Sequence, residues 1–249
     1  MPRTDFLTFC RYTVASAALC AAVSGCRSNR SEVRAPVALK KPVLHTNFQP
    51  PDPQQPLRSF EQIIVLPEEQ FDIAEAVLCV SAEIALPDAP PDSATTLLEL
   101  DRLAKRATEE LPQNPDGIDY LDTLYEFVLD RRKADPFRDD RAENYDLSLA
   151  VQKRRGTCLS VGIGVLAVAR RMHAPVWGVQ CPGHFYLKWV EPDPAQTPPV
   201  LVFDVTRPTH ENWKKLDDDF YRRWHHIDPQ AESSGAYLRP LSDREVLSV

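Results

Sequence analysis

The stretch that decides the fold is Arg155-Gly156-Thr157-Cys158-Leu159-Ser160. Gly156 interrupts the helical pattern before it, and the apolar residues after Cys158 predict a strongly buried helix that ends near Met172. A helix N-terminus carries unpaired N–H groups and about half a positive charge, which favours a thiolate and lowers a cysteine pKa. The position of Cys158 is therefore typical of a nucleophile. The alternative is a small buried hydrophobic side chain, since free cysteine is among the most buried residue types.

Three short segments after this helix have the composition of strands: residues 176–179, 185–190 and 200–205. The last two should pair as an antiparallel hairpin. If Val190 faces Val200, then Asp204 lies opposite Tyr186 and is a diagonal neighbour of His184 on the same face of the sheet. We therefore expect the carboxylate and the imidazole to lie within reach of a hydrogen bond.

The helix that begins at Cys158 must pack on this sheet to bury its apolar surface, which brings the thiol against His184. A carboxylate beside an imidazole holds one tautomer and supports the charged form. The pattern predicts an α+β fold with a catalytic triad. In this triad Cys158 is the nucleophile, His184 is first base and then acid, and Asp204 orients the imidazole.

Several motifs carry a family resemblance: Arg154-Arg155-Gly156-Thr157-Cys158, Ala169-Arg170-Arg171-Met172, Pro182-Gly183-His184-Phe185 and Phe203-Asp204. In these motifs the sequence resembles the transglutaminase-like superfamily, specifically its bacterial SirB-type branch, and the likeness extends from about Phe71 to Val249. The resemblance implies a papain-like fold, in which an N-terminal helical lobe precedes a Cys-bearing helix packed on an antiparallel sheet. It also implies a Cys-His-Asp active site.

The resemblance further implies that Asn144 lies near the site, where it could help to polarise an acyl oxygen, although an asparagine before a helix is more often a cap. Two departures from the family concern function. Many proteins of this branch carry another residue where Cys158 stands, so membership alone does not imply catalysis. The chain also stops at Val249, short of the helical repeats that follow in longer relatives.

In the chain before Cys158, apolar residues at helical spacing predict a helical scaffold. We expect helices over residues 71–82, 97–107, 117–131 and 147–151. The single folded domain is predicted over residues 59–249, with a helical part at 59–135 and a catalytic-type core at 136–249.

The first 25 residues read as a lipoprotein signal peptide. Arg3 and Arg11 precede an apolar run that is too short for a permanent membrane anchor, and the run ends Val23-Ser24-Gly25-Cys26. We expect cleavage before Cys26 and lipidation of its thiol. An ordinary signal peptide or a short membrane segment is the alternative. Residues 26–58 are polar and rich in proline, which predicts a flexible tether.

Three cysteines then remain, Cys79, Cys158 and Cys181, and an odd number leaves at least one free thiol. All three are reduced, or Cys79 pairs with Cys181. Cys181 and His184 form a Cys-x-x-His pair from which a metal site could be drawn with Cys158 and Asp204. We do not favour this site, because such spacing is common by chance, and we expect neither a metal nor a cofactor.

The remaining polar and aromatic features favour structural interpretations. Trp177 and Trp189 are expected in the core rather than along a groove, and His173, His225 and His226 on the surface. The acidic run 217–219 is interpreted as the solvated face of a helix over residues 212–223, because it lacks a calcium-loop pattern. The net charge of −7, from 29 basic and 36 acidic residues without a basic block, argues against nucleic acid as a partner.

Together these patterns predict a protein of the bacterial cell envelope, held on a membrane by a lipid and facing the periplasm or the exterior. The expected chemistry is acyl transfer on an amide of a peptide or protein substrate, as in a peptidase, an amidase or a transglutaminase. The rival hypothesis is a non-catalytic envelope module that binds its ligand in a papain-like groove.

Overall fold

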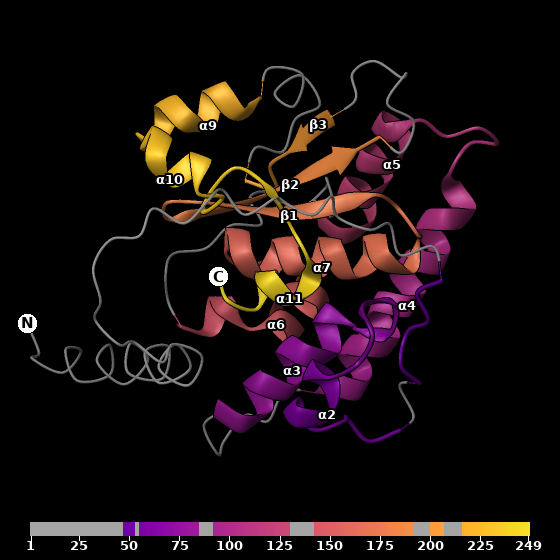
Figure 1. Ribbon diagram of the computed structural model, residues 1–249. Coiled ribbons are helices and arrows are strands. Elements are labelled where there is room, and N and C mark those ends of the chain that lie inside the picture. Colours follow the sequence, from indigo (N-terminus) through magenta and orange to yellow (C-terminus); the bar gives the residue numbers. More distant parts are fainter. Residues whose placement is uncertain (1–46, 53–54, 85–91, 130–141, 192–199, 207–215) are drawn as a thin grey trace, which may run out of the picture. The chain divides into compact units, whose positions relative to one another are not determined.

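The computed structural model describes residues 47–52, 55–84, 92–129, 142–191, 200–206 and 216–249 (Figure 1). The predicted signal peptide, Cys26 and most of the predicted tether lie outside these ranges. Within them, no helix is both long enough and apolar enough to cross a membrane.

Helices form the first half of the described chain. In order they are α2 (Phe60–Ile64), η1 (Glu68–Gln70), α3 (Ile73–Ile84), α4 (Ser93–Glu110), α5 (Gly117–Leu124), η2 (Tyr125–Leu129), η3 (Ala142–Tyr145), α6 (Leu147–Lys153) and α7 (Cys158–Arg171). Most of the longer helices begin at a capping side chain: Asp92, Asp116 and Asp146 each accept a backbone N–H of the first turn. These elements confirm the predicted helices, although the third changes to a π-helical turn after Leu124.

A four-stranded antiparallel sheet follows α7, in the order β3-β2-β1-β4. Its strands are β1 (Val176–Cys181), β2 (His184–Val190), β3 (Val200–Phe203) and β4 (Pro240–Leu241). Val190 pairs with Val200 and Leu187 with Phe203, so the register predicted for the hairpin is confirmed. The sequence did not predict β4, because two residues are too few to show a strand pattern.

The sheet lies between two sets of helices (Figure 1). Helix α7 packs on one face, where a Cβ on Gly162 would come within 2.7 Å of the Phe185 ring. The other face is covered by α9 (Asp218–Trp224) and α10 (Pro229–Ser233), and the chain ends in α11 (Asp243–Val246). Trp177 and Trp189 are buried, which confirms their place in the core. The result is a mixed helix and antiparallel-sheet architecture of the α+β class.

The part of the predicted tether that the structure describes packs against the folded domain. Phe48 is buried, and its ring lies 5.9 Å from the guanidinium of Arg171. Arg58 donates from Nε to Glu75 at 3.0 Å. Two residues of the predicted tether, Phe48 and Arg58, therefore contact the folded domain.

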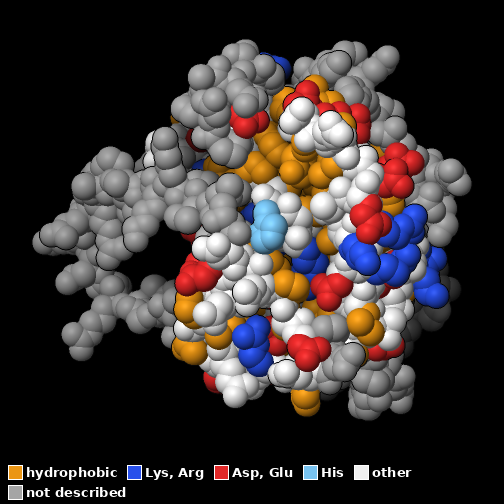
Figure 2. All heavy atoms as spheres, turned by 90° about the vertical axis from the view of Figure 1, so that its right-hand side faces the viewer, with side chains coloured by type: hydrophobic (Ala, Val, Ile, Leu, Met, Phe, Trp, Pro, Cys, Tyr) orange, Lys and Arg blue, Asp and Glu red, His pale blue; other side chains and the backbone are white. Residues whose placement is uncertain are grey.

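Two arginines at the end of α7 join distant parts of the chain. Arg170 and Asp243 form an ion pair at 2.8 Å in which both side chains are only 2% exposed. Arg171 pairs with Asp72 at 2.8 Å and with Asp101 at 2.6 Å. These contacts hold α11, α3 and α4 against the helix that carries Cys158. On the face shown in Figure 2, by contrast, basic side chains lie beside acidic ones around an area of hydrophobic side chains.

Candidate active site

Cys158 is the first residue of α7, and the turn before it is tightly built. Thr157 caps the helix by accepting the backbone N–H of Ser160, and Ser160 Oγ in turn accepts the N–H of Thr157 at 3.1 Å. The carbonyl of Asn144 accepts from Ser160 Oγ at 2.7 Å and from the Thr157 N–H at 3.1 Å. These bonds fix the direction in which the thiol leaves the helix N-terminus.

The structure corrects the role expected of Gly156 as the residue that ends the preceding helix. Helix α6 ends at Lys153, and the left-handed conformation that stops it belongs to Arg154, with φ of 53°. Gly156 instead permits a close approach. A Cβ there would lie 2.4 Å from Ser160 Oγ and 3.0 Å from the carbonyl oxygen of Asn144. Only glycine lets η3 sit against the start of α7.

His184 and Asp204 meet as the hairpin register predicts. Nε2 of His184 lies 3.0 Å from Oδ2 of Asp204. Asp204 is buried, with its side chain 1% exposed, whereas the His184 side chain is 14% exposed. The other carboxylate oxygen, Oδ1, accepts the N–H of Thr206 at 2.8 Å and the Thr206 hydroxyl at 2.7 Å. The carboxylate is therefore held from both sides.

The thiol of Cys158 and the imidazole of His184 lie close enough for each group to shift the pKa of the other. Burial raises the pKa of Cys158, but hydrogen bonds from His184 and from the backbone N–H of Phe185, with the charge of His184, lower it below its usual value. Burial lowers the pKa of His184, but hydrogen bonds with Asp204 and Cys158 raise it to about 9. This arrangement shifts the pair toward a thiolate beside an imidazolium.

The same charges act on Asp204. Burial raises its pKa, but the hydrogen bond and the charge of His184, followed by the two hydrogen bonds from Thr206, bring the pKa below its usual value. The carboxylate thus stays ionised at neutral pH, as an orienting group must. The structure therefore places His184 within hydrogen-bonding distance of Asp204, with Cys158 near His184.

Two further residues of the site were not predicted from the sequence. Tyr221 is buried, and its hydroxyl donates to Oδ2 of Asp204 at 2.8 Å. The ring of His225 lies nearly parallel to that of His184, with centroids 5.7 Å apart and an interplanar angle of 11°. Burial and the charge of His184 lower the pKa of His225, against a hydrogen bond to the backbone of Pro182. His225, which was expected on the surface, is partly buried and stacks on His184.

The acidic run 217–219 also differs from its predicted role. The expected helical start near residue 212 lies outside the described residues; helix α9 begins at Asp218, and Asp217 caps it by accepting the N–H of Phe220 at 2.6 Å. Asp218 faces the sheet, where it pairs with Lys188 at 2.6 Å and accepts the hydroxyl of Tyr186 at 3.2 Å. The interpretation as a purely solvated face is therefore wrong for Asp218, whereas Asp217 and Asp219 are exposed.

Asn144 lies next to the start of α7 and is buried, as the resemblance implies for its position. Its carbonyl holds the turn before Cys158, and this backbone role needs no particular side chain. The proposed action of its side-chain amide on an acyl oxygen stays a prediction.

All three cysteines among the described residues are free thiols. Cys79 and Cys181 are buried, and Cys181 Sγ lies 3.6 Å from the carbonyl oxygen of His184. Burial raises the pKa of Cys181 to about 12, and the charges of Asp204 and Cys158 add to this effect. The alternative of a Cys79–Cys181 disulfide is not what the structure shows. The described residues also contain no group of three or more His, Cys, Asp or Glu side chains placed to hold a metal ion.

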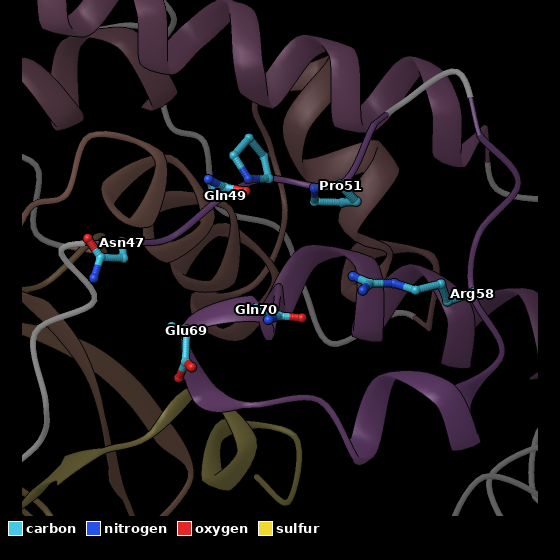
Figure 3. A pocket seen from close by; sticks show the side chains of 7 residues that line it. Asn47, Gln49, Pro51, Arg58, Glu69 and Gln70 are labelled. Carbon is cyan, nitrogen blue, oxygen red and sulfur yellow. The ribbon is translucent and has the colours of Figure 1, made fainter.

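A polar hollow of about 460 Å³ lies away from these residues (Figure 3). Its lining comes from the N-terminal part of the described chain: Asn47, Gln49, Pro50, Pro51, Arg58, Glu69 and Gln70. None of the predicted site residues contributes to it. Its position gives no reason to link it to the cysteine chemistry.

A family model described as "Transglutaminase-like superfamily" matches residues 94–248, which is more than half of the chain. The chain is also similar to UPF0162 protein PA3419 of Pseudomonas aeruginosa, with 28% identity over 187 residues. That alignment covers 73% of this chain and 63% of the relative, so the chain spans less than two thirds of the relative's length. No solved structure gave a significant match.

Proposed function

Because the chain belongs to the transglutaminase-like superfamily, we propose that it is a cysteine-dependent acyl-transfer enzyme whose catalytic residues are Cys158, His184 and Asp204. The observation that carries this proposal is the 3.0 Å contact of His184 Nε2 with buried Asp204, next to the Cys158 thiol whose pKa His184 lowers. We further propose that the chain belongs to the SirB-type branch and that its substrate is an amide of a peptide or protein.

The geometry supports a two-step reaction. The Cys158 thiolate attacks the amide carbonyl carbon, a C–S bond forms, and the C–N bond breaks as the His184 imidazolium gives its proton to the leaving amine. The neutral imidazole then takes a proton from water or from an acceptor amine, which attacks the thioester. The C–S bond breaks, the thiolate returns, and the proton stays on His184. Asp204 remains ionised throughout and stabilises the imidazolium.

The acceptor decides the class of enzyme. Water as acceptor makes the protein a peptidase or amidase, and an amine makes it a transglutaminase. The half-buried thiol beside a largely buried imidazole is open to either acceptor.

The test is the pH dependence of iodoacetamide alkylation, followed for each cysteine by peptide mass spectrometry. We expect the midpoint for Cys158 to lie below the value of about 8.5 for an ordinary thiol. Replacing His184→Ala should return the midpoint toward that value. Cys79 and Cys181 are internal controls, because burial raises the pKa of both thiols.

The same experiment examines the rival hypothesis of a non-catalytic binding module. A Cys158 midpoint near pH 8.5 that His184→Ala leaves unchanged would count for the module and against the enzyme. A Cys181→Ala variant should keep the wild-type profile of Cys158, because the hydrogen bond that lowers the Cys158 pKa comes from His184.

We also propose that Cys26 carries a lipid that holds the protein on the membrane of a bacterial envelope. The support is the sequence alone, in which small residues precede Cys26 at the end of an apolar run. Fractionation of cells that express Cys26→Ser tests it, with Cys20→Ser as the control. Loss of Cys26→Ser from the membrane fraction is expected, and its retention there would contradict lipid anchoring.

A further inference from the structure

One face of α9 is matched to the polar side of β2. Asp218, Tyr221 and His225 follow one another at spacings of three and four residues, which places them on one side of the helix. Asp218 meets Lys188 and Tyr186, and His225 lies over His184. Tyr221, between them, reaches Asp204. The helix thus contacts the candidate triad through its middle residue.

The hydroxyl of Tyr221 and the imidazole of His184 bond the same oxygen. Oδ2 of Asp204 lies 2.8 Å from the Tyr221 hydroxyl and 3.0 Å from Nε2 of His184. Burial and the negative charge of Asp204 raise the pKa of Tyr221, so the phenol keeps its proton and always donates. The carboxylate charge is therefore shared between a neutral donor and a ring that carries a positive charge.

On the basis of the function proposed above, we propose that Tyr221 is a positioning residue that shares Oδ2 of Asp204 with His184 and so limits how strongly the carboxylate holds the imidazolium. Thr206 keeps Oδ1 in place from the other side. Loss of the Tyr221 hydroxyl should therefore leave the carboxylate in place. Oδ2 should then stabilise the His184 imidazolium more strongly, because it no longer accepts the second hydrogen bond.

The strength of the Asp204–His184 interaction affects how readily His184 gives its proton to the leaving amine. An imidazolium that is held too strongly is a poor acid toward the leaving amine, and catalysis is most efficient when the pKa lies near the working pH. The pKa of His184 is already raised to about 9. A second donor on the carboxylate keeps it from rising further.

Several titratable groups from four elements and one loop lie around His184. They are Cys158 of α7, Cys181 of β1, Tyr186 of β2, Asp204 after β3, Tyr221 of α9 and His225 at the C-cap of α9. A change at Tyr221 leaves the other five side chains in place, so a shift in the His184 titration can be assigned to the missing hydroxyl.

The experiment compares Tyr221→Phe with Tyr186→Phe. The two rings stack at 3.9 Å with an interplanar angle of 2°, and both side chains are fully buried. Only the Tyr221 hydroxyl bonds Asp204, whereas that of Tyr186 bonds Asp218. Both variants lose one oxygen from the same ring stack. The readout is the NMR titration of the His184 Cε1–H resonance, assigned with His184→Ala.

We expect the His184 inflection to rise in Tyr221→Phe by about 0.5 to 1 pH unit, since a hydrogen bond to a charged group is worth about one such unit or more. Tyr186→Phe should leave it unchanged. No shift in Tyr221→Phe, a downward shift, or an equal shift in Tyr186→Phe would each overturn the proposal. A downward shift would mean that the hydroxyl holds the carboxylate in place rather than sharing its charge.

A second variant tests the proposal if Tyr221→Phe does not fold. Replacing Tyr221 with 3-fluorotyrosine keeps the hydroxyl and makes it a stronger donor, so the His184 inflection should fall, and a rise would contradict the proposal. The titration does not depend on catalysis. If alkylation shows an ordinary Cys158 thiol while the inflection still moves with Tyr221, the proposed function fails and the role of Tyr221 stands. If alkylation shows a lowered Cys158 midpoint while the His184 inflection does not move with Tyr221, the proposed function stands and the role of Tyr221 is contradicted.

Discussion

Nε2 of His184 lies 3.0 Å from Oδ2 of Asp204, although the two residues are 20 positions apart in the chain. The contact follows from the pairing of β2 with β3, in which Val190 faces Val200 and Leu187 faces Phe203. Because strand register sets which side chains share a face, a shift of one residue would place the carboxylate on the opposite face of the sheet. The candidate triad therefore depends on hairpin register as much as on residue identity.

Replacing Asp204→Asn should weaken the thiolate–imidazolium pair. A neutral amide cannot stabilise the imidazolium, so the pKa of His184 should fall by about 1 to 3 units and the neutral-pH alkylation rate of Cys158 by about 10-fold or more. Asp218→Asn is the matched control, because Asp218 lies on the same face of the sheet and pairs with Lys188 instead. Equal alkylation rates in the two variants would contradict the orienting role of Asp204.

The pair of Cys158 and His184 has a defined effect on stability against pH. Between pH 6.5 and about 9, folded His184 holds a proton that the unfolded chain has lost. The pKa of Cys158 is lowered from 9.0, so the folded thiolate has lost a proton that the unfolded chain keeps. Because the slope of stability with pH follows the difference in bound protons, the two effects oppose each other. The wild-type free energy of unfolding should therefore fall less steeply in this window than that of a variant without the Cys158 thiolate.

Cys158→Ser removes that compensation. The stabilisation of the His184 imidazolium by Asp204 is fully present below pH 6.5 and is lost as the pH rises through the folded-state pKa. We therefore expect the free energy of unfolding of this variant to fall by about 1 to 2 kcal/mol between about pH 6 and pH 9. Urea unfolding followed by tryptophan fluorescence measures it. A wild-type slope as steep as that of the variant would argue against the ion pair.

Gly156→Ala should disturb the start of α7. The added Cβ would meet Ser160 Oγ at 2.4 Å and the Asn144 carbonyl at 3.0 Å, so the turn must shift. We expect the free energy of unfolding to fall by about 1 to 3 kcal/mol and the alkylation of Cys158 to become slower. Gly164→Ala is the control within the same helix, because its nearest neighbour lies at 3.6 Å and alanine favours a helix. If Gly156→Ala and Gly164→Ala unfold at the same temperature, the close approach of Ser160 and Asn144 does not explain why position 156 needs glycine.

Asp243→Ala should destabilise the domain strongly. It would leave the guanidinium of Arg170 buried without its partner, which costs about 3 to 5 kcal/mol. The surface pair of Glu99 and Arg102 is the control, because Arg102 is half exposed and such pairs contribute about 0 to 1 kcal/mol. The measurement is urea unfolding of Asp243→Ala and Glu99→Ala. A small effect of Asp243→Ala would show that water or another acceptor replaces the carboxylate.

Local pattern was sufficient for the elements that carry the triad. The apolar run after Cys158 predicted α7, and the alternation before Val190 and after Val200 predicted the hairpin and its register. It was not sufficient for Tyr221 and His225. Their helix is short and strongly charged, and charge alone does not say which side of a helix meets a sheet. Two aromatic residues at positions 221 and 225 were the available signal, since a spacing of four places them on one face.

The amino-acid sequence by itself determined which residues could form the reactive group, because helix periodicity, strand alternation and hairpin length are local properties of neighbouring residues. It therefore specified Cys158 at a helix N-terminus and His184 beside Asp204. Tertiary structure alone decided what surrounds these residues: α9 brings Tyr221 to Asp204, and Arg170 meets Asp243 across 73 positions. Such contacts follow from how whole elements pack to bury their apolar faces, and no short stretch of sequence contains that information.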